Sequence, residues 1–173
     1  DPDSDRGKRR LDAETAVRDW ADKSGTDHII LRVPGIYGPG RIRVEKVKNH
    51  EPVLREKDAP YSNRIHADDL ARICMAAAKK GKPGAMYNTS DGNPSSITDY
   101  YQTIAKLLGE EPPPTISMEE AKEVMSPMAL SFLQESKRLD NSKMLQELGV
   151  QLLYPEAEAG LRASLKEMGY IEN

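Results

Sequence analysis

The stretch HIILRVPGIYGPGR, from His28 to Arg41, joins a short apolar run to a loop rich in proline and glycine. Proline fixes φ and removes a backbone donor, while glycine lets the backbone approach a flat ligand closely. Pro34 and Gly35 therefore could shape a ligand-binding loop. A turn that simply requires proline and glycine is the alternative that these residues leave open.

A second group that could do chemistry is the sequence HADD, in which His66 precedes Asp68 and Asp69. An imidazole beside carboxylates can transfer protons near neutral pH or help to hold a metal ion. No second histidine or cysteine stands at ligand spacing, so we predict no metal site. We favour a structural role for His66, at the turn from a strand into a helix, over a catalytic one.

Cationic residues gather in RGKRR, residues 6–10, and in RIRVEKVK, residues 41–48. Glu45 interrupts the second group and no aromatic residue is interleaved with it, which is typical of a solvated helix face. Binding of an anionic group is the alternative, and Arg41 is the candidate in this group for contact with a substrate.

The elements that must position these groups follow from hydrophobic periodicity and helix-end residues. Buried strands are expected over 29–33 and 85–89, and a short strand over 51–55. Helices are predicted over 5–25, 41–49, 67–81, 96–109, 117–125, 140–149 and 154–169, with a further start at Pro127. Cys74 is expected to be a small buried residue of the helix over 67–81. Alternating strands and helices indicate an α/β fold.

The composition narrows the possible partners. The 173 residues carry a formal net charge of -3, and aromatic residues make up 5%. This leaves no basic field and few rings for stacking, so we expect no nucleic-acid partner and no membrane partner. The single cysteine excludes an internal disulfide framework and suits a reducing compartment, so we expect a cytoplasmic location.

Four motifs occur in the order seen in extended short-chain dehydrogenases/reductases, the NAD-dependent epimerase/dehydratase-like proteins. They are LRVPGIYGPG, NRIHADDLA, YNTSDG, and KRLDNSKMLQELG with YPEAEAGLRASL. The resemblance implies the C-terminal part of a Rossmann-like doubly wound parallel sheet with a small, mostly helical substrate-binding lobe. Residues 1–111 would hold the Rossmann-like strands and helices with part of the lobe, and residues 112–173 would form a helical segment of the lobe.

The resemblance covers only the C-terminal half of such a protein. A full member begins with a strand, a Gly-rich turn and a helix that hold the dinucleotide pyrophosphate, and neither G-x-x-G-x-x-G nor G-x-G-x-x-G occurs here. We therefore expect the complete protein to bind NAD or NADP and this chain alone to bind them weakly or not at all. The strand over 29–33 needs neighbours on both edges, so we expect a homodimer or association with a missing N-terminal half.

The catalytic positions depart from the pattern of the family. Members carry Tyr-x-x-x-Lys at the start of the helix that corresponds to residues 5–25, and Arg6 and Arg10 stand on those two positions. Arginine stays protonated up to a pKa above ~12, so it cannot exchange a proton near neutrality as an activated tyrosine does. Arg10 could still donate hydrogen bonds to ribose hydroxyls. The catalytic residues therefore remain unassigned.

The resemblance also implies binding residues. The loop after the strand over 29–33 passes the nicotinamide end of the cofactor in the family. The implied cofactor-binding residues are Arg10, Pro34, Gly35, Ile36 and Tyr37. A nucleotide-sugar arginine of the family matches Ser62, with Arg64 offset by two positions, and the segment with Lys137, Arg138 and Asn141 faces the substrate cleft. The implied substrate residues are Arg41, Ser62, Arg64 and Arg138.

These observations together predict the substrate-side portion of an NAD(P)-dependent epimerase, dehydratase or reductase-like protein that acts on a small molecule and lacks the Tyr-x-x-x-Lys dyad. If the protein is an enzyme, it is an oxidoreductase or epimerase of the extended type. Two alternatives stay open. One is a non-catalytic dinucleotide-binding or regulatory module, and the other is an interaction protein that kept only the substrate lobe.

Overall fold

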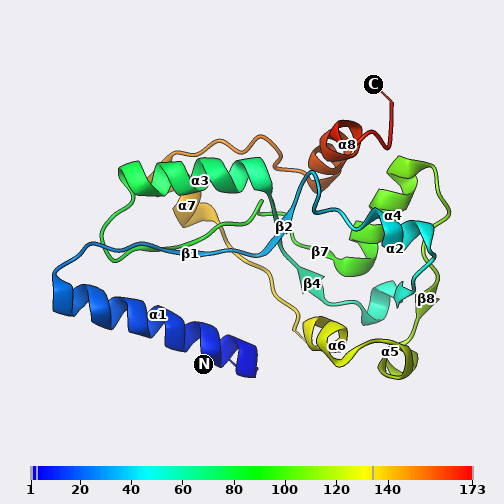
Figure 1. Cartoon of the computed structure of the whole chain (residues 1–173), viewed down its shortest axis with the longest axis horizontal. Coiled ribbons are helices and arrows are strands. Elements are labelled where there is room, and N and C mark those ends of the chain that lie inside the picture. The colour runs from blue at the N-terminus through cyan, green and yellow to red at the C-terminus, as the bar shows by residue number, and fades with distance from the viewer. Residues whose placement is uncertain (1, 3, 134, 173) are drawn as a thin grey trace.

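The computed structural model describes residues 2, 4–133 and 135–172, and Figure 1 shows the order of its elements. Two parallel strands, β1 (Ile30–Arg32) and β6 (Met86–Asn88), pair with Leu31 opposite Tyr87. Both strands lie inside the ranges expected from their apolar runs. Parallel pairing requires a crossover, which the chain between them provides through α3 (Ala67–Lys80).

The first helix, α1 (Asp5–Ser24), runs beside β1 in Figure 1. The hydroxyl of its N-cap, Ser4, accepts a hydrogen bond from the Gly7 N–H. Gly25 ends the helix at a φ of 66°, a left-handed conformation that suits glycine, as the sequence predicts. Ala21 is the buried residue of this helix. Most of α1 is thus held by few apolar contacts within the described part of the chain.

The first hydrophobic core lies between β6, α3 and α7 (Ser142–Leu148). The helices contribute residues spaced three or four apart, which places them on one face of each helix. Its buried members are Ile65, Ile73, Ala77, Tyr87, Met144 and Leu148.

A second parallel pair continues the chain beyond β1. Strand β2 (Gly35–Tyr37) pairs with β5 (Arg64–His66), with Gly35 opposite Arg64 and Tyr37 opposite His66. Exposure falls from Gly35 to Tyr37 along β2, so the strand enters the core at the tyrosine. This parallel arrangement confirms the α/β fold class.

The remaining elements form a mostly helical lobe, on the right of Figure 1. Its helices are α2 (Val44–Lys48), α4 (Ile97–Leu108), α5 (Met118–Val124), α6 (Pro127–Leu133) and α8 (Ala157–Glu167). Its strands pair as β3 (Val53–Leu54) with β8 (Thr115–Ile116), parallel, and β4 (Tyr61–Ser62) with β7 (Ser95–Ser96), antiparallel. A 3-10 turn, η1 (Glu56–Asp58), follows β3. The second core joins α2, α4 and α8 through residues such as Val47, Ile104, Leu161 and Leu165.

One prediction about the helix α3 was wrong. Cys74 is exposed, whereas the sequence pattern suggested a buried residue. The buried face of α3 is formed by Asp69, Ile73 and Ala77, at a spacing of four. Cys74 follows Ile73 by one residue, which turns its side chain about 100° around the helix and away from the core.

Within the described residues, no helix is both long enough and apolar enough to cross a membrane. Those residues also contain no group of three or more histidine, cysteine, aspartate or glutamate side chains that could hold a metal ion.

Candidate functional site

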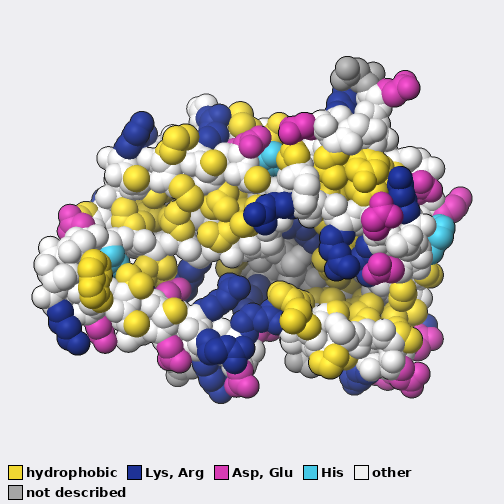
Figure 2. All heavy atoms as spheres, viewed as in Figure 1, with side chains coloured by type: hydrophobic (Ala, Val, Ile, Leu, Met, Phe, Trp, Pro, Cys, Tyr) yellow, Lys and Arg dark blue, Asp and Glu magenta, His cyan; other side chains and the backbone are white. Residues whose placement is uncertain are grey.

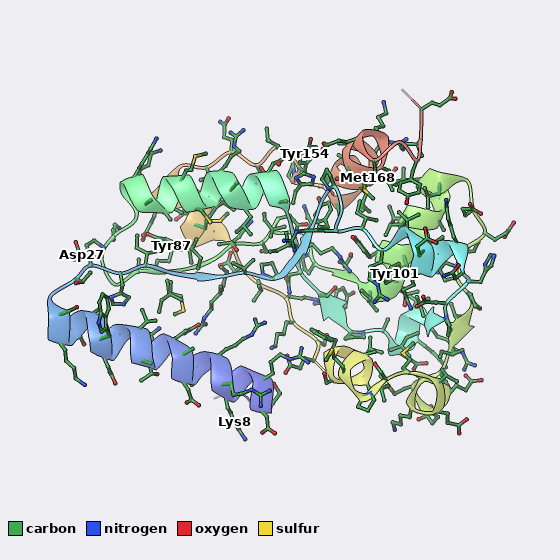
Figure 3. All side chains as sticks on the ribbon, viewed as in Figure 1. Lys8, Asp27, Tyr87, Tyr101, Tyr154 and Met168 are labelled. Carbon is green, nitrogen blue, oxygen red and sulfur yellow. The ribbon has the colours of Figure 1, made fainter. Side chains whose placement is uncertain are left out.

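A cavity of about 1070 Å³ opens between α1, the end of β1 and the chain segment that follows α6. Its walls come from α1, residues 30–35, residues 61–63 and Asn88, together with Phe132, Glu135, Lys137 and Leu139. Figure 2 shows a hollow at the centre of this face of the molecule, with lysine and arginine side chains gathered around it. In Figure 3, side chains of α1 and of the chain around β1 project into the space between these two elements. In open α/β sheets, ligands bind beyond the carboxyl ends of the strands. The cavity runs along β1 and continues past its carboxyl end to Pro34 and Gly35.

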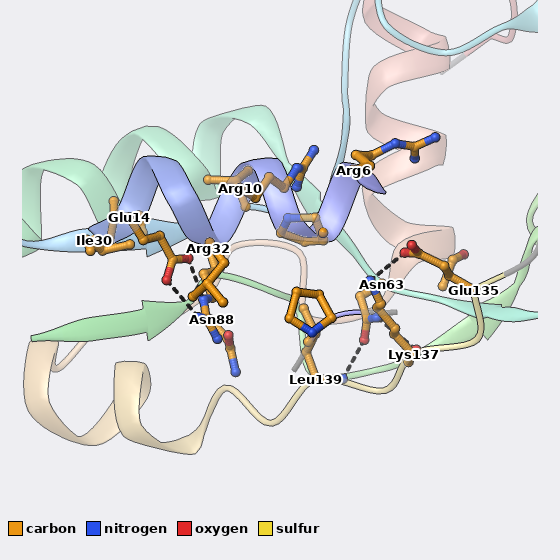
Figure 4. A pocket seen from close by; sticks show the side chains of 18 of the residues that line it. Arg6, Arg10, Glu14, Ile30, Arg32, Asn63, Asn88, Glu135, Lys137 and Leu139 are labelled. Atoms are coloured by element: carbon orange, nitrogen blue, oxygen red, sulfur yellow. Dashed lines mark hydrogen bonds and ion pairs between the residues drawn. The ribbon is translucent and has the colours of Figure 1, made fainter. Parts of the chain in front are cut away.

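The structure brings four of the predicted site residues to this cavity. Arg10 reaches it from α1, Pro34 and Gly35 from the step between β1 and β2, and Ser62 from β4. Figure 4 shows Arg10 and Arg6 projecting from the same helix beside it. The backbone of Gly35 is tied to β5, because its N–H donates to the carbonyl oxygen of Asn63 at 3.2 Å.

The other predicted residues lie elsewhere. Tyr37 is buried against His66 and α8, its ring centroid 5.2 Å from that of the histidine. Burial raises the pKa of its hydroxyl far above the ordinary value, so Tyr37 does not ionise near neutrality. Ile36 is half-buried and packs against the first core. Arg41 is exposed, and Arg138 stacks on the ring of Tyr61 at 3.8 Å.

Arg64 is placed away from the cavity by its own packing. Its guanidinium lies 4.0 Å from the ring centre of Tyr100 and donates to the hydroxyl of Ser95 at 3.0 Å. Burial lowers the pKa of Arg64 from its ordinary value. The nearby carboxyl of Asp91 is also buried, which raises its pKa to about 6. Both groups are buried and do not line the cavity.

His66 joins three elements. Its Nδ1 accepts the backbone N–H of Asp68 at 3.2 Å, which caps α3, and its Nε2 lies 3.0 Å from the hydroxyl of Ser164 on α8. The ring also packs against Tyr154. Asp69 accepts the N–H groups of the segment before α8, at Leu153 and Tyr154. The HADD sequence therefore forms a structural joint in this fold.

An ion pair that was not predicted from the sequence joins α1 to β1 in the wall of the cavity. The Nε and Nη2 atoms of Arg32 on β1 donate to the two carboxylate oxygens of Glu14 on α1, each at 2.7 Å. Dashed lines mark this bidentate pair in Figure 4. The hydrogen bond from Arg32 lowers the pKa of Glu14. The sequence did contain a sign of this ion pair, because Arg32 is the one charged residue in the apolar run 29–34 and a charge in a buried strand needs a partner.

A second missed residue is Asn63. Its amide nitrogen donates to the carbonyl oxygen of Lys137 at 2.9 Å, and its amide oxygen accepts the N–H of Leu139 at 2.8 Å. The side chain thereby holds the far wall of the cavity in place. No local pattern in the sequence indicates this contact, because its partners lie more than 70 positions away.

Arg6 does not stand free in the cavity. Its guanidinium stacks over the ring of Phe132 at 3.8 Å and donates to the hydroxyl of Ser131 at 2.5 Å. An arginine cannot serve as a proton-exchanging group near neutrality. On the position where the resemblance implies a tyrosine, the structure thus places a contact between α1 and α6.

Comparisons with known proteins agree with this architecture. The protein YeeZ of Escherichia coli strain K12 is 27% identical over 146 residues, which are 81% of this chain and 46% of YeeZ. A functionally unknown conserved protein from Silicibacter pomeroyi DSS is 33% identical, with a TM-score of 0.85 over 96% of this chain and 57% of that chain. The human epimerase family protein SDR39U1, solved with NADPH, has a TM-score of 0.68 at 18% identity, covering 82% of this chain and 49% of its own. The chain shares the fold of the two solved structures.

The chain spans about half the length of these relatives, namely 46% of YeeZ and 57% of the Silicibacter protein. No family model matches the sequence. The structural similarity shows that this chain has the fold of the matching part of these proteins.

Proposed function

We propose that this chain is the substrate-side part of an NAD(P)-dependent epimerase, dehydratase or reductase-like protein without the Tyr-x-x-x-Lys dyad. The observation that carries the proposal is the cavity along β1 and past its carboxyl end, which Arg10, Pro34 and Gly35 line. The structural similarity to an epimerase family protein solved with NADPH supports it. A small-molecule substrate fits a cavity of about 1070 Å³.

The residues of the cavity suit the nicotinamide end of a dinucleotide. When bound, the dinucleotide would supply hydride-transfer chemistry. Arg10 would donate hydrogen bonds to ribose hydroxyls, and Pro34 with Gly35 would present a backbone surface without bulky side chains to a planar ring. The pyrophosphate needs backbone donors at a Gly-rich turn, which this sequence does not contain. That part of the site would come from a preceding half of the protein.

A non-catalytic dinucleotide-binding or regulatory module is the second candidate. The observation that favours it is the engagement of Arg6 with Ser131 and Phe132, at the position where a catalytic tyrosine is implied. Neither Arg6 nor Arg10 can cycle a proton near neutrality. The two candidates differ in one measurable property, because only the first turns over a substrate.

The proposal is tested by titrating NADH and NADPH, by calorimetry, into this chain and into a protein in which it follows its Gly-rich half. The chain alone should not saturate below about 1 mM, and the longer protein should bind in the micromolar range. In the longer protein, Arg10→Ala should weaken binding by about tenfold, as loss of a charge-assisted hydrogen bond predicts. Arg9→Ala, on the exposed side of α1, is the matched control. Micromolar binding by the chain alone would contradict the proposed division of the site. Unaltered binding in Arg10→Ala would remove Arg10 from the cofactor site.

A further inference from the structure

The helix α6 (Pro127–Leu133) has no buried residue in the described structure. Met128 and Phe132, its large apolar side chains, are 73% and 60% exposed. Helices in proteins draw most of their stability from packing an apolar face. The helix α6 contacts α5 and leaves Ala129, Leu130 and Leu133 only partly buried, so this packing is thin. Contacts outside the two hydrophobic cores therefore contribute to holding this helix where it is.

The chain is anchored on both sides of α6. On one side, α5 is capped reciprocally by Ser117 and Glu120 and buries Ala121. On the other side, Asn63 holds the backbone of Lys137 and Leu139. The helix α6 thus spans two fixed points, and Phe132 contributes to the wall of the cavity.

Between these anchors, α6 is tied to the rest of the molecule by Arg6. The guanidinium reaches across the cavity edge, stacks on Phe132 and donates to Ser131. Figure 1 shows the N-terminal end of α1 pointing towards α6, which is the direction this contact needs. Just beyond α6, the Lys137 ammonium donates a hydrogen bond to the Glu135 carboxylate, which lowers the pKa of that carboxyl.

We propose that α6 is a lid over the cavity and that Arg6 is the positioning residue that latches it to α1. This inference rests on the proposed function, since it assigns α6 control of access to the same site. The latch consists of one stacking contact and one hydrogen bond at a partly exposed position, which is strong enough to favour the closed lid and weak enough to open. Loss of both contacts should raise the fraction of open lid by about 5- to 50-fold.

The guanidinium suits a latch because it combines a flat cation for stacking with fixed donors and does not lose its charge. A lysine can reach a ring and a hydroxyl, but it lacks the planar fork. Arg6→Lys should therefore restore part of the latch, whereas Arg6→Ala removes it. Partial rescue separates a latch from a general requirement for a well-packed residue at this position.

The test is limited digestion of the whole chain with chymotrypsin, with cleavage sites mapped by mass spectrometry. Phe132 is the single phenylalanine of the sequence, so cleavage after it reports opening of α6. Arg6→Ala should speed cleavage at Phe132 by about 5- to 50-fold, with Arg6→Lys in between. Arg9→Ala, one turn along α1 from the latch, should match the wild type. Equal rates in Arg6→Ala and Arg9→Ala, or faster cleavage at tyrosines throughout the chain, would overturn the proposal.

Hydrogen exchange gives a second, independent measure of lid opening. Hydrogen exchange of residues 127–133 should rise most in Arg6→Ala, less in Phe132→Ala, which keeps the hydrogen bond to Ser131, and no further in the double variant than in Arg6→Ala. Effects that add up in the double variant would overturn the latch. Neither measurement uses a dinucleotide, so a failed latch and a failed cofactor proposal are distinguishable.

Discussion

Replacement of Gly160 by alanine tests how closely α8 is seated on β2. Gly160 is buried in α8, and a Cβ at this position would overlap the hydroxyl of Tyr37 and come within 2.9 Å of its Cε2 atom. The tyrosine cannot easily yield, because it is 2% exposed and lies against His66 and Tyr100. The contact therefore has to be relieved by moving α8 or the strand.

Two opposing effects set the magnitude. Alanine is a better helix former than glycine by about 0.5–1 kcal/mol, which would stabilise α8. Overpacking of a tight core costs about 1–3 kcal/mol, which acts against it. Taking the difference, we expect Gly160→Ala to lower the free energy of unfolding by about 1–2 kcal/mol. For a chain of this length the melting temperature should fall by about 2–8 °C.

The assay is thermal and urea unfolding of Gly160→Ala, Tyr37→Phe and the double variant. Tyr37→Phe removes a buried hydroxyl that has no hydrogen-bond partner within the described residues, so it should be neutral or slightly stabilising. In the Tyr37→Phe background, Gly160→Ala should cost less than in the wild type, because the overlapping oxygen is gone. An unchanged or higher stability of the single variant Gly160→Ala would refute this account of the packing.

Three further predictions concern charge and association. The carboxyl of Asp91, with a pKa raised from 3.8 to about 6, keeps a proton in the folded state that the unfolded chain releases, so stability should fall as the pH rises through this window. Asp91→Asn should remove that pH dependence and stabilise the fold at pH 7 by about 1–2 kcal/mol in urea titrations, and an unchanged pH profile would contradict it. Glu14→Gln should lower the free energy of unfolding by about 0.5–1 kcal/mol at pH 7. Below the lowered pKa of Glu14 it should have no effect, because the wild-type carboxyl group is then protonated and neutral as well. Light scattering at micromolar concentration should detect a dimer or larger species, since β1 pairs only with β6 among the described strands, and a monodisperse 19.3 kDa monomer would contradict this.

Local signals in the sequence were sufficient to predict most of the helices and strands. The apolar run from Ile29 to Val33 predicted β1, and glycines at the ends of helices marked real stops, such as Gly25 and Gly149 in the left-handed conformation. These features depend on residues within one or two turns of one another. Local sterics and hydrogen bonding decide them, so they can be read along the chain.

The tertiary structure decided which way the side chains point and which ones meet. Tyr37 turned into the core because pairing of β2 with β5 set its face, and Cys74 turned outward because Ile73 took the buried side of α3. The sequence marked Arg6 as unable to exchange protons, but its partners, Ser131 and Phe132, are about 125 positions away. Contacts of this kind depend on how the elements pack in space, and no local period or motif encodes that packing.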